Sequence, residues 1–390
     1  MGLNKRVQNL GTESAFTVLA RATSLAAEGR DIINLGIGQP DFATPEHIVE
    51  AAVKALRDGH HGYTPAKGIG ELRAAVAHDF QARNGATLNP DQILIVPGGK
   101  VTMAFAMLLL GEAGHEILYP DPGFPIYGSM AGFSGAKPIR YTLSADKGYG
   151  IDADQILGKV TQATRLIILN SPGNPTGGIN APEELRKLAE GLKKWPNVYV
   201  LSDEIYSRLY FDGIDHLSPF TLPGMADRTI ILDGWSKTYA MTGWRLGWSY
   251  WPQTLIDMAE RLAINIHSCV NAAAQQAALA ALQGPQDAVE TMRRAFQERR
   301  DLVAQRFSQM DQITCPLPRG AFYAFPEIRI PGKTAEQIQD TLLMEQGLAL
   351  IAGTSFGAQG TQNVRLSFAN SLANIERALD KLSAWLERQG

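Results

Sequence analysis

The sequence predicts an α/β protein of two domains, with a mostly parallel sheet covered by helices in the larger domain and a smaller α/β domain after it. Three observations lead to this prediction. With 390 residues, the chain exceeds the usual size of a single hydrophobic core. Short apolar runs alternate with helical stretches, as in parallel sheets that are covered on both faces. From about residue 285 the pattern changes to long, charged amphipathic helices.

The expected strands of the larger domain are short runs of apolar and β-branched residues. The first is DQILIV at 91–96, which ends at Pro97-Gly98-Gly99 and precedes a helix expected over 100–110. The other runs expected to form strands lie at 116–119, 165–169, 198–201, 229–232 and 245–250, with a helix at 181–194 between two of them. This alternation is what predicts the mostly parallel sheet.

The last third of the chain predicts the smaller domain. Helical patterns at 286–310, 334–346 and 371–388 alternate with strand-like pieces at 321–325 and 364–368. We therefore expect a large domain over 43–284 and a small domain over 285–390, with the N-terminal segment 1–42 joining the small domain.

Composition limits the kind of function. The net charge of −3 gives no electrostatic reason to expect nucleic acid or a membrane surface as partner. Cys269 and Cys315 are far apart and form no metal-ligand pattern, so we expect reduced, structural thiols and no metal site. The beginning of the chain lacks an apolar signal core, and VTMAFAMLLL at 101–110 is too short to span a bilayer. These features predict a cytoplasmic enzyme.

Polar segments follow several of the expected strands. Parallel sheets bind ligands beyond the carboxyl ends of their strands. The segments at these ends are Gly98-Gly99-Lys100, Asn170 to Gly177, Asp203 to Tyr206, and Ser236-Lys237. We expect them to meet in one crevice.

The stretch DGWSKTYAMTGWRLGW at 233–248 places Lys237 eight positions before Arg245. An amine near a forked cation suits a carbonyl compound that also carries a phosphate, because the amine condenses with the carbonyl and the arginine binds the phosphate. Pyridoxal 5′-phosphate (PLP) is such a compound. Lys237 is thus the candidate Schiff-base lysine, with a solvated surface lysine as the alternative.

SDEIY at 202–206 supplies the next contacts. Asp203 ends an apolar strand, where an unpaired carboxylate is costly, and the protonated ring nitrogen of PLP would be its cationic partner. The alternative is an aspartate that caps the following turn. Tyr206 can donate a hydrogen bond to the phenolic oxygen of the ring, and Ile205 can pack against one ring face.

Two further residues complete the expected ring contacts. Asn174, in SPGNPTGG at 171–178, lies in a turn set by Pro175 and Gly177 that would aim its amide into the crevice. The alternative is that Asn-Pro and Thr-Gly are only turn-forming dipeptides. Phe124, in DPGFPIY, is the candidate for stacking on the other ring face, with a core phenylalanine as the alternative.

The expected phosphate site combines a helix N-terminus with side chains. Gly99 and Lys100 open a helix whose backbone N–H groups attract anions. Ser236 offers a hydroxyl, and Arg245 offers a guanidinium that matches phosphate oxygens. The spacing of a P-loop is absent around Gly-Gly-Lys.

VRLSFA at 364–369 places Arg365 on an apolar strand, where it needs an anionic partner. We expect this anion to be the α-carboxylate of a substrate, with a structural salt bridge as the alternative. Gly38, in LGIGQPDF, would leave room for that carboxylate near the backbone.

Together these segments resemble the class I/II aminotransferases of PLP fold type I, and more closely the aspartate aminotransferase-like ones. The order of LGIGQPDFATP (35–45), HGYTPAKGIGELR (61–73), VPGGK, the three segments above, PRGAFYAFP (318–326) and VRLSFA matches the family over nearly the whole chain. The resemblance implies a homodimer in which Tyr63 reaches the phosphate of the partner subunit. It also implies a ping-pong mechanism through an aldimine and a ketimine, in which an L-amino acid gives its α-amino group to a 2-oxo acid.

The preferred substrate stays open at this point. In bacterial aspartate aminotransferases that resemble this chain, the lysine matching Lys100 can meet a distal carboxylate, which favours aspartate or glutamate. Glu13 replaces a small hydroxyl residue near that pocket and would repel an acidic side chain. Alanine, aromatic and branched-chain donors are the alternatives. Gly234 and Gln39 also depart from many relatives, which carry serine and glutamate at these positions.

Other functions are also consistent with parts of the pattern. A PLP-dependent β-lyase or decarboxylase would use the same scaffold. The effector domain of a regulator would need a DNA-binding module, and no basic helix-turn-helix segment precedes residue 30. A dinucleotide-binding oxidoreductase is set aside because no G-x-G-x-x-G opens a first helix.

Overall fold

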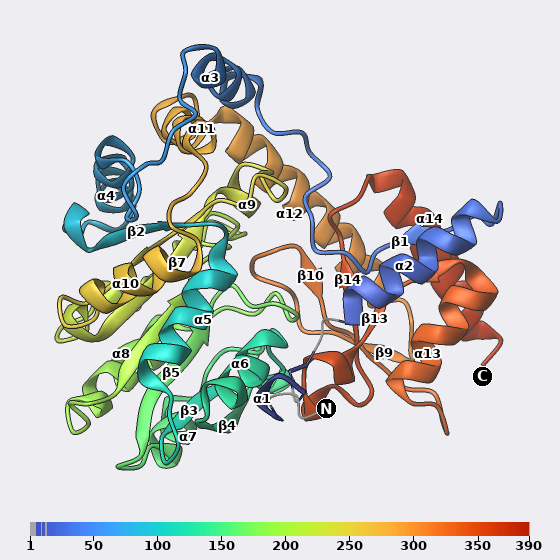
Figure 1. Ribbon diagram of the computed structural model, residues 1–390. Coiled ribbons are helices and arrows are strands. Elements are labelled where there is room, and N and C mark those ends of the chain that lie inside the picture. Colours follow the sequence, from blue (N-terminus) through green and yellow to red (C-terminus); the bar gives the residue numbers. More distant parts are fainter. Residues whose placement is uncertain (1–4, 9, 12–13, 390) are drawn as a thin grey trace.

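The computed structural model describes residues 5–8, 10–11 and 14–389. A central seven-stranded sheet forms the larger lobe of the molecule, and a second lobe with short strands and long helices lies beside it (Figure 1). In sheet order, the strands of the large sheet are β2 (Ile93–Val96), β8 (Gly247–Tyr250), β7 (Thr229–Gly234), β6 (Tyr199–Asp203), β5 (Thr164–Asn170), β3 (Glu116–Asp121) and β4 (Lys137–Thr142).

The large sheet is mostly parallel, as predicted. β7, β6, β5, β3 and β4 pair in parallel, while β8 runs antiparallel to both of its neighbours, β2 and β7. Every expected strand run overlaps an observed strand. Arg245, however, precedes β8 and has a φ of 53°, so the strand expected from residue 245 begins two residues later. β4 was not predicted, because it lacks an apolar run and includes the exposed residues Lys137, Pro138 and Arg140.

Alternating side chains of the strands reach the two faces of the sheet. Ile117 and Ile168 pack on one face with helices α5, α6 and α10, whereas Leu118 and Ile167 pack on the other with α7 and α8. A further core joins the β2 end of the sheet to α3, α4 and α11. The helices of this lobe are α3 (Glu46–Arg57), α4 (Gly70–Asn84), α5 (Gly99–Leu110), α6 (Ile126–Ser134), α7 (Ala153–Lys159), α8 (Pro182–Leu192), α9 (Trp235–Thr238), α10 (Ile256–Ile266) and α11 (Ala272–Gln283).

The smaller lobe has its own core, which includes residues from both ends of the chain. Its helices are α12 (Asp287–Phe307), α13 (Ala335–Thr341) and α14 (Leu372–Glu387), and α13 continues into a π-helical turn at Leu342–Gln346. Its short strands are β9 (Ile313–Thr314), β10 (Tyr323–Ala324), β11 (Glu327–Ile328), β12 (Leu348–Ala349), β13 (Ile351–Ala352) and β14 (Val364–Ser367), with β14 between β10 and β13.

The N-terminal segment contacts both lobes: its first helix packs against α6 of the larger lobe, and its strand pairs with the smaller lobe. Strand β1 (Ile33–Asn34) pairs in parallel with β12, and Ile33 and Leu35 belong to the core of that lobe. Helices α1 (Lys5–Gln8) and α2 (Ser14–Ala27) precede it. The chain then passes from β1 to α3 in the larger lobe (Figure 1). The expected domain limits after residues 42 and 284 remain predictions.

Candidate active site

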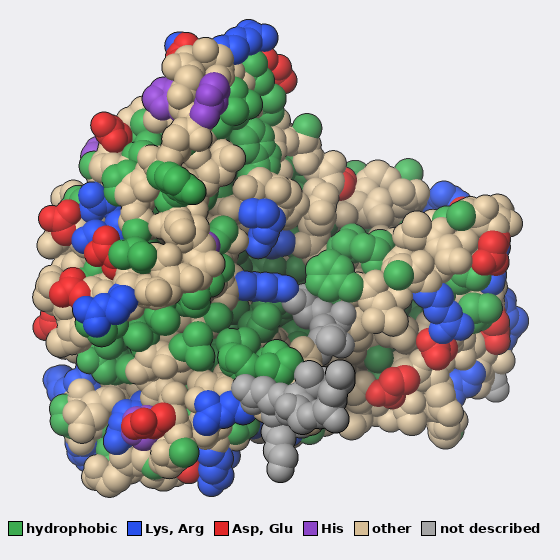
Figure 2. Space-filling view, in the orientation of Figure 1, with side chains coloured by type: hydrophobic (Ala, Val, Ile, Leu, Met, Phe, Trp, Pro, Cys, Tyr) green, Lys and Arg blue, Asp and Glu red, His purple; other side chains and the backbone are tan. Residues whose placement is uncertain are grey.

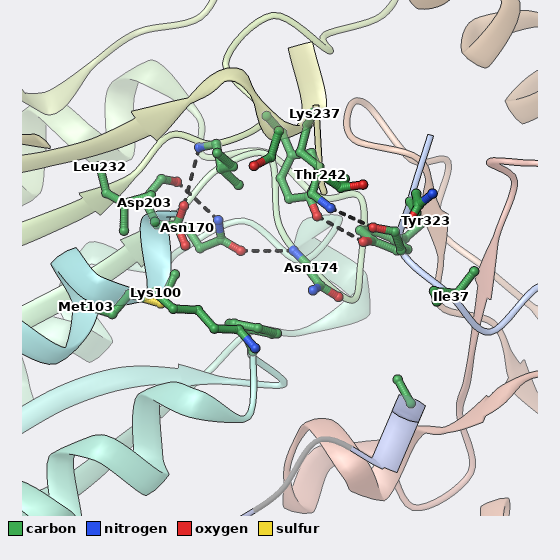
Figure 3. Close-up of a pocket in the computed structure, with 18 of the residues that line it drawn as sticks. Ile37, Lys100, Met103, Asn170, Asn174, Asp203, Leu232, Lys237, Thr242 and Tyr323 are labelled. Carbon is green, nitrogen blue, oxygen red and sulfur yellow. Dashed lines mark hydrogen bonds between the residues drawn. The ribbon is translucent and has the colours of Figure 1, made fainter. Parts of the chain in front are cut away.

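A cavity of about 510 Å³ lies at the carboxyl ends of the central strands, beside the smaller lobe. Figure 2 shows the hollow between the lobes, with basic side chains at its edge. All the predicted site residues except Tyr63 line this cavity. They are Gly38, Gly99, Lys100, Phe124, Asn174, Asp203, Tyr206, Ser236, Lys237, Arg245 and Arg365. The four polar segments therefore do meet in one crevice (Figure 3).

Lys237 lies in the short helix α9, directly after β7. Its Nζ donates a hydrogen bond of 2.6 Å to the carbonyl oxygen of Gly38, which belongs to the N-terminal segment. The same ammonium lies 5.7 Å from the ring centre of Phe322, in the smaller lobe. The amine thus sits where the two lobes and the N-terminal segment meet.

Asp203 ends β6 and is 3% exposed. Its Oδ2 accepts a hydrogen bond of 2.6 Å from the hydroxyl of Tyr127, and its Oδ1 accepts one of 3.3 Å from the N–H of Ile205. Burial raises the pKa of this carboxyl to about 7, although both hydrogen bonds favour the charged form. A carboxylate in this position is best stabilised by a cation at its open side.

Tyr206 follows in the next turn and is buried with its ring edge-on to Phe322. Its hydroxyl lies 2.9 Å from the hydroxyl of Tyr323, so the two phenols share a hydrogen bond. Burial raises the pKa of Tyr206 well above its ordinary value, with the neighbouring phenol adding to the effect. Tyr206 is therefore a neutral hydrogen-bond donor at physiological pH.

Asn174 and Arg365 approach each other from different lobes (Figure 3 labels Asn174). Arg365 Nη1 donates a hydrogen bond of 2.9 Å to Asn174 Oδ1, and Nη2 donates one of 2.5 Å to the carbonyl of Gly36. The guanidinium lies between the rings of Tyr323 and Phe356, 4.7 and 4.8 Å from their centres. This packing holds a buried cation at one end of the cavity.

A second basic group lies at the N-terminus of α5. Gly98 has a φ of 95°, and a Cβ added there would lie 2.1 Å from Nη2 of Arg245. The absent side chain thus allows the guanidinium to lie directly over the first turn of the helix that Gly99 begins. Arg245 Nη1 also donates to the carbonyl of Thr242 at 2.9 Å. With the hydroxyl of Ser236, these groups form a cradle of donors for a dianion.

Lys100 lies on another side of the cavity from Lys237 (Figure 3). Its ammonium is 5.8 Å from the ring centre of Phe16 and 5.5 Å from that of Phe124. Phe124 is also packed edge-on against Tyr127. The cavity therefore has one region where a cation is flanked by two aromatic rings.

Sequence reasoning missed several residues that shape this site. Tyr127 contacts Asp203, and Asn170 fixes two predicted residues by accepting from the N–H of Asn174 at 2.9 Å and donating to the carbonyl of Asp203 at 3.1 Å. Tyr323 contacts Tyr206 and also explains Gly38, because a Cβ at position 38 would lie 2.1 Å from the Tyr323 hydroxyl. All these residues lie in motifs of the sequence, but only the folded chain shows their contacts.

Tyr63 is 94% exposed and lies outside the cavity of its own chain. Glu13 lies outside the described residues, so its expected effect on the substrate pocket stays a prediction.

Comparison with known proteins decides the family. The family model "Aminotransferase class I and II" matches residues 30–382. The chain belongs to the class I and II aminotransferases. Among its relatives, the aspartate aminotransferase of Geobacillus stearothermophilus is 36% identical over 99% of each chain. The solved structure of the aspartate aminotransferase from Rhizobium meliloti has a TM-score of 0.94 at 33% identity, over the full length of both chains. An alanine aminotransferase from Pyrococcus furiosus also reaches 0.94, at 32% identity over 99% of this chain and 100% of that one.

As a class I and II aminotransferase, the protein is a PLP-dependent transaminase that moves an α-amino group from an amino acid to a 2-oxo acid. The residues present fit this cofactor. The buried carboxyl of Asp203 suits a protonated ring nitrogen, and the donors of Arg245 and the N-terminus of α5 suit a phosphate. No helix among the described residues is long and apolar enough to cross a membrane. In the same part of the chain, no cluster of histidine, cysteine and acidic residues would hold a metal ion.

Proposed function

We propose that this aminotransferase acts on dicarboxylic amino acids, aspartate and glutamate, and their 2-oxo acids. The observation that carries the proposal is the arrangement of charge in the cavity. Lys100, Lys237, Arg245 and Arg365 are cationic, and Asp203 is the one acid among the described residues that line it. Such a cavity favours ligands with several negative groups.

In this proposal, residues around the cavity would each hold a different part of the cofactor. Arg245 and the N-terminus of α5 would hold the phosphate of the cofactor, and Asp203 would pair with its ring nitrogen. Tyr206 and Asn174 donate to the ring oxygen, while Phe124 and Ile205 cover the ring faces. When bound, the cofactor withdraws electrons from the α-carbon of the substrate, which makes the α-proton acidic.

The chain's own residues then bind and orient the amino acid. Arg365 binds the α-carboxylate through its forked guanidinium, next to the amide of Asn174. The Lys237 amine would hold the cofactor, and in the presence of substrate it would act as the general base and acid that takes and returns the α-proton. Tyr323 and Arg365 of the smaller lobe form part of the cavity wall.

Lys100 gives the substrate preference in this scheme. Arg245 is assigned to the phosphate and Arg365 to the α-carboxylate, and the Lys100 ammonium is assigned to the substrate side chain. It lies where a substrate side chain would extend, between the Phe16 and Phe124 rings. A distal carboxylate there would gain a charge-assisted hydrogen bond, which contributes roughly 1.5–3 kcal/mol.

The same two rings support a second candidate. Phe16, Phe124 and the apolar side chains of Ile37 and Met103 offer an apolar wall to an aromatic donor. An aromatic amino acid would use this wall and leave the Lys100 ammonium at its edge. We therefore place aromatic donors second.

Half-reactions test the proposal directly. The bound cofactor is mixed with aspartate, glutamate, alanine or phenylalanine, and the change in its absorption is followed. Aspartate or glutamate should react fastest, and Lys100→Met should lower kcat/KM for aspartate by roughly 10- to 100-fold while changing phenylalanine little. If aspartate fails to react while alanine or phenylalanine does, the acidic assignment is wrong.

We also propose that the enzyme is a homodimer with shared sites. The nearly full exposure of Tyr63 supports this, as do the exposed apolar side chains of Met258, Ile264 and Ile266 on α10. In a dimer, the Tyr63 hydroxyl would reach the phosphate held by Arg245 of the partner subunit.

A mixed dimer tests the sharing of sites. Lys237→Ala and Tyr63→Ala chains, each of low activity alone, are unfolded together and refolded. Sharing predicts recovered activity, because the hybrid has one site with Lys237 and a partner's Tyr63 both intact. Activity no higher than the average of the two variants would contradict it, and sedimentation shows whether dimers form.

The domain limits after residues 42 and 284 remain part of the proposal, as does a cytoplasmic location. The pairing of β1 with β12 supports joining residues 1–42 to the smaller domain. Free thiols at Cys269 and Cys315 suit a reducing compartment. Thermal unfolding of the separately expressed large domain would test the domain limits. Localisation of a tagged chain would test the cytoplasmic location.

A further inference from the structure

Behind the cavity wall, one buried carboxylate joins the turn that carries Lys237 to the turn that carries Tyr206. Asp233, in β7, lies four residues before Lys237, and Ser207 directly follows Tyr206. Asp233 Oδ2 accepts a hydrogen bond of 2.7 Å from the Ser207 hydroxyl. Its Oδ1 accepts one of 2.7 Å from the N–H of Gly234, the residue that caps the lysine-bearing helix α9. Each oxygen of Asp233 thus holds one of the two turns.

Arg83, from α4, stabilises this carboxylate. Its Nη2 lies 3.8 Å from Asp233 Oδ2, its Nη1 donates to the Ser207 hydroxyl at 3.4 Å, and its Nε donates to Asp79 at 3.0 Å. The Asp233 side chain is only 6% exposed, so an unpaired charge there would be strongly destabilising. Burial raises the pKa of Asp233 to about 6, and Arg83 opposes the rise, so the carboxylate is mainly ionised above pH 7.

These residues do not touch the substrate side of the site. Within the part of the chain that the structure describes, Asp233, Ser207 and Arg83 are absent from the lining of the catalytic cavity. Ser207 and Arg83 instead line a separate hollow of about 560 Å³. The charge of Asp233 also helps to raise the pKa of Asp203, so an effect of the group on catalysis would pass either through this charge or through the placement of Lys237 and Tyr206.

The strand pairing of the sheet ends where the two turns begin. Its last pairs here are Asp203 with Leu232 and Gly234 with Gly247, and both turns begin where these pairs end. Beyond this point the backbones of the two turns are linked by the Asp233 side chain. A displacement of about 1 Å in a catalytic group can slow a reaction about 100-fold, so such a link matters for the rate.

We infer that Asp233 is a positioning residue, which sets the placement of the Lys237 amine relative to the Tyr206 phenol by hydrogen-bonding both turns. The inference rests on the proposed function, in which these two side chains act on the same cofactor. It requires the two hydrogen bonds and not the charge. Asparagine retains both bonds, because its oxygen accepts from Gly234 N–H and its amide N–H donates to Ser207. Leucine has nearly the same shape and retains neither.

The test compares wild type, Asp233→Asn and Asp233→Leu as complete PLP-loaded enzymes, well below the lowest melting temperature. Asp233→Leu should lower kcat roughly 10- to 100-fold, with KM for the amino acid within about twofold of wild type, because Arg365 and Asn174 lie outside the group. It should also slow the attachment of added PLP to Lys237 in the apoprotein, followed by absorbance and borohydride trapping. Asp233→Asn should restore most of both rates.

Three results would overturn the inference: a wild-type kcat in Asp233→Leu, an asparagine variant as slow as the leucine variant, or a rise in KM at constant kcat. If Asp233→Leu does not fold, Ser207→Ala decides, since it removes one of the two links and should lower kcat by about three- to tenfold. A wild-type kcat in Ser207→Ala would contradict the inference. Ser249→Ala is the matched control, because this buried serine hydrogen-bonds Leu94 and Trp251 and should leave kcat unchanged.

The wild-type protein shows whether the proposed function or only the role of Asp233 has failed. If it fails to attach PLP at Lys237, the proposed function fails. If it attaches PLP and turns over while Asp233→Leu and Ser207→Ala equal it in kcat, only the role of Asp233 is wrong.

Discussion

Replacing Asp203 by asparagine is expected to stabilise the cofactor-free protein at high pH and to weaken its hold on the cofactor. Burial raises the pKa of Asp203 from 3.8 to about 7 in the folded chain, whereas the unfolded chain exposes the carboxyl. Between pH 4 and pH 7 the unfolded state has therefore lost a proton that the folded state retains. The free energy of unfolding must fall as the pH rises through this window and level off above pH 7.

The size of the effect follows from the shift. A rise of about three pKa units corresponds to about 4 kcal/mol of lost stability above pH 7, of which about 3 kcal/mol is lost between pH 5 and pH 8. Asparagine does not ionise, and its oxygen still accepts from Tyr127 or Ile205. The apoprotein of Asp203→Asn should thus gain about 3 kcal/mol over wild type on going from pH 5 to pH 8.

Urea unfolding of both apoproteins at the two pH values measures this difference. Asp212→Asn is the control of opposite sign, because hydrogen bonds from Arg300 and Arg319 lower the pKa of Asp212, so its loss should destabilise at both pH values. An Asp203→Asn apoprotein that gains nothing at pH 8 relative to pH 5 would refute the argument. Bound PLP should remove the loss in the wild type, since its ring cation pairs with Asp203, and should stabilise the variant less.

Three other substitutions test the site. In Lys237→Ala, borohydride should trap no PLP on the chain, and an adduct on another lysine, found by peptide mapping, would contradict the assignment. Arg365→Ala should lower kcat/KM for amino acids by at least about 30-fold, because a buried charge pair is broken, and an unchanged kcat/KM would remove Arg365 from the substrate site. Gly38→Ala should lower kcat at least about tenfold, because its Cβ would lie 2.1 Å from the Tyr323 hydroxyl. Adding Tyr323→Phe should relieve the clash and restore the melting temperature. A Gly38→Ala variant with the kcat and melting temperature of wild type would show that the contact is unimportant.

The fold was predictable where local patterns decide it. Apolar runs such as RLIIL at 165–169 have few alternatives to a buried strand, and they lie within the observed β5. Strand direction is not a local property, so nothing in residues 245–250 indicated that β8 runs against its neighbours. β4 is an edge strand with exposed Lys137 and Arg140, and its sequence lacks the apolar character of the central strands.

The site was predictable because its residues lie at the ends of recognisable strands. Lys237 and Asp203 could be found in this way. Tyr127 and Tyr323 could not, because their contacts join positions 76 and 117 residues apart in the chain. The link through Asp233 is of the same kind: Ser207 lies 26 residues away, and no spacing rule connects them.

The hydrogen bond from Lys237 to the Gly38 carbonyl makes the N-terminal segment and the cofactor competitors for a single nitrogen. When that nitrogen is bonded to the cofactor, the segment between β1 and α3 would lose this hydrogen bond to the larger lobe. The hydrogen bond could form again only once the nitrogen is released. The attachment of the N-terminal segment to the larger lobe would in this way depend on the chemical state of one side chain.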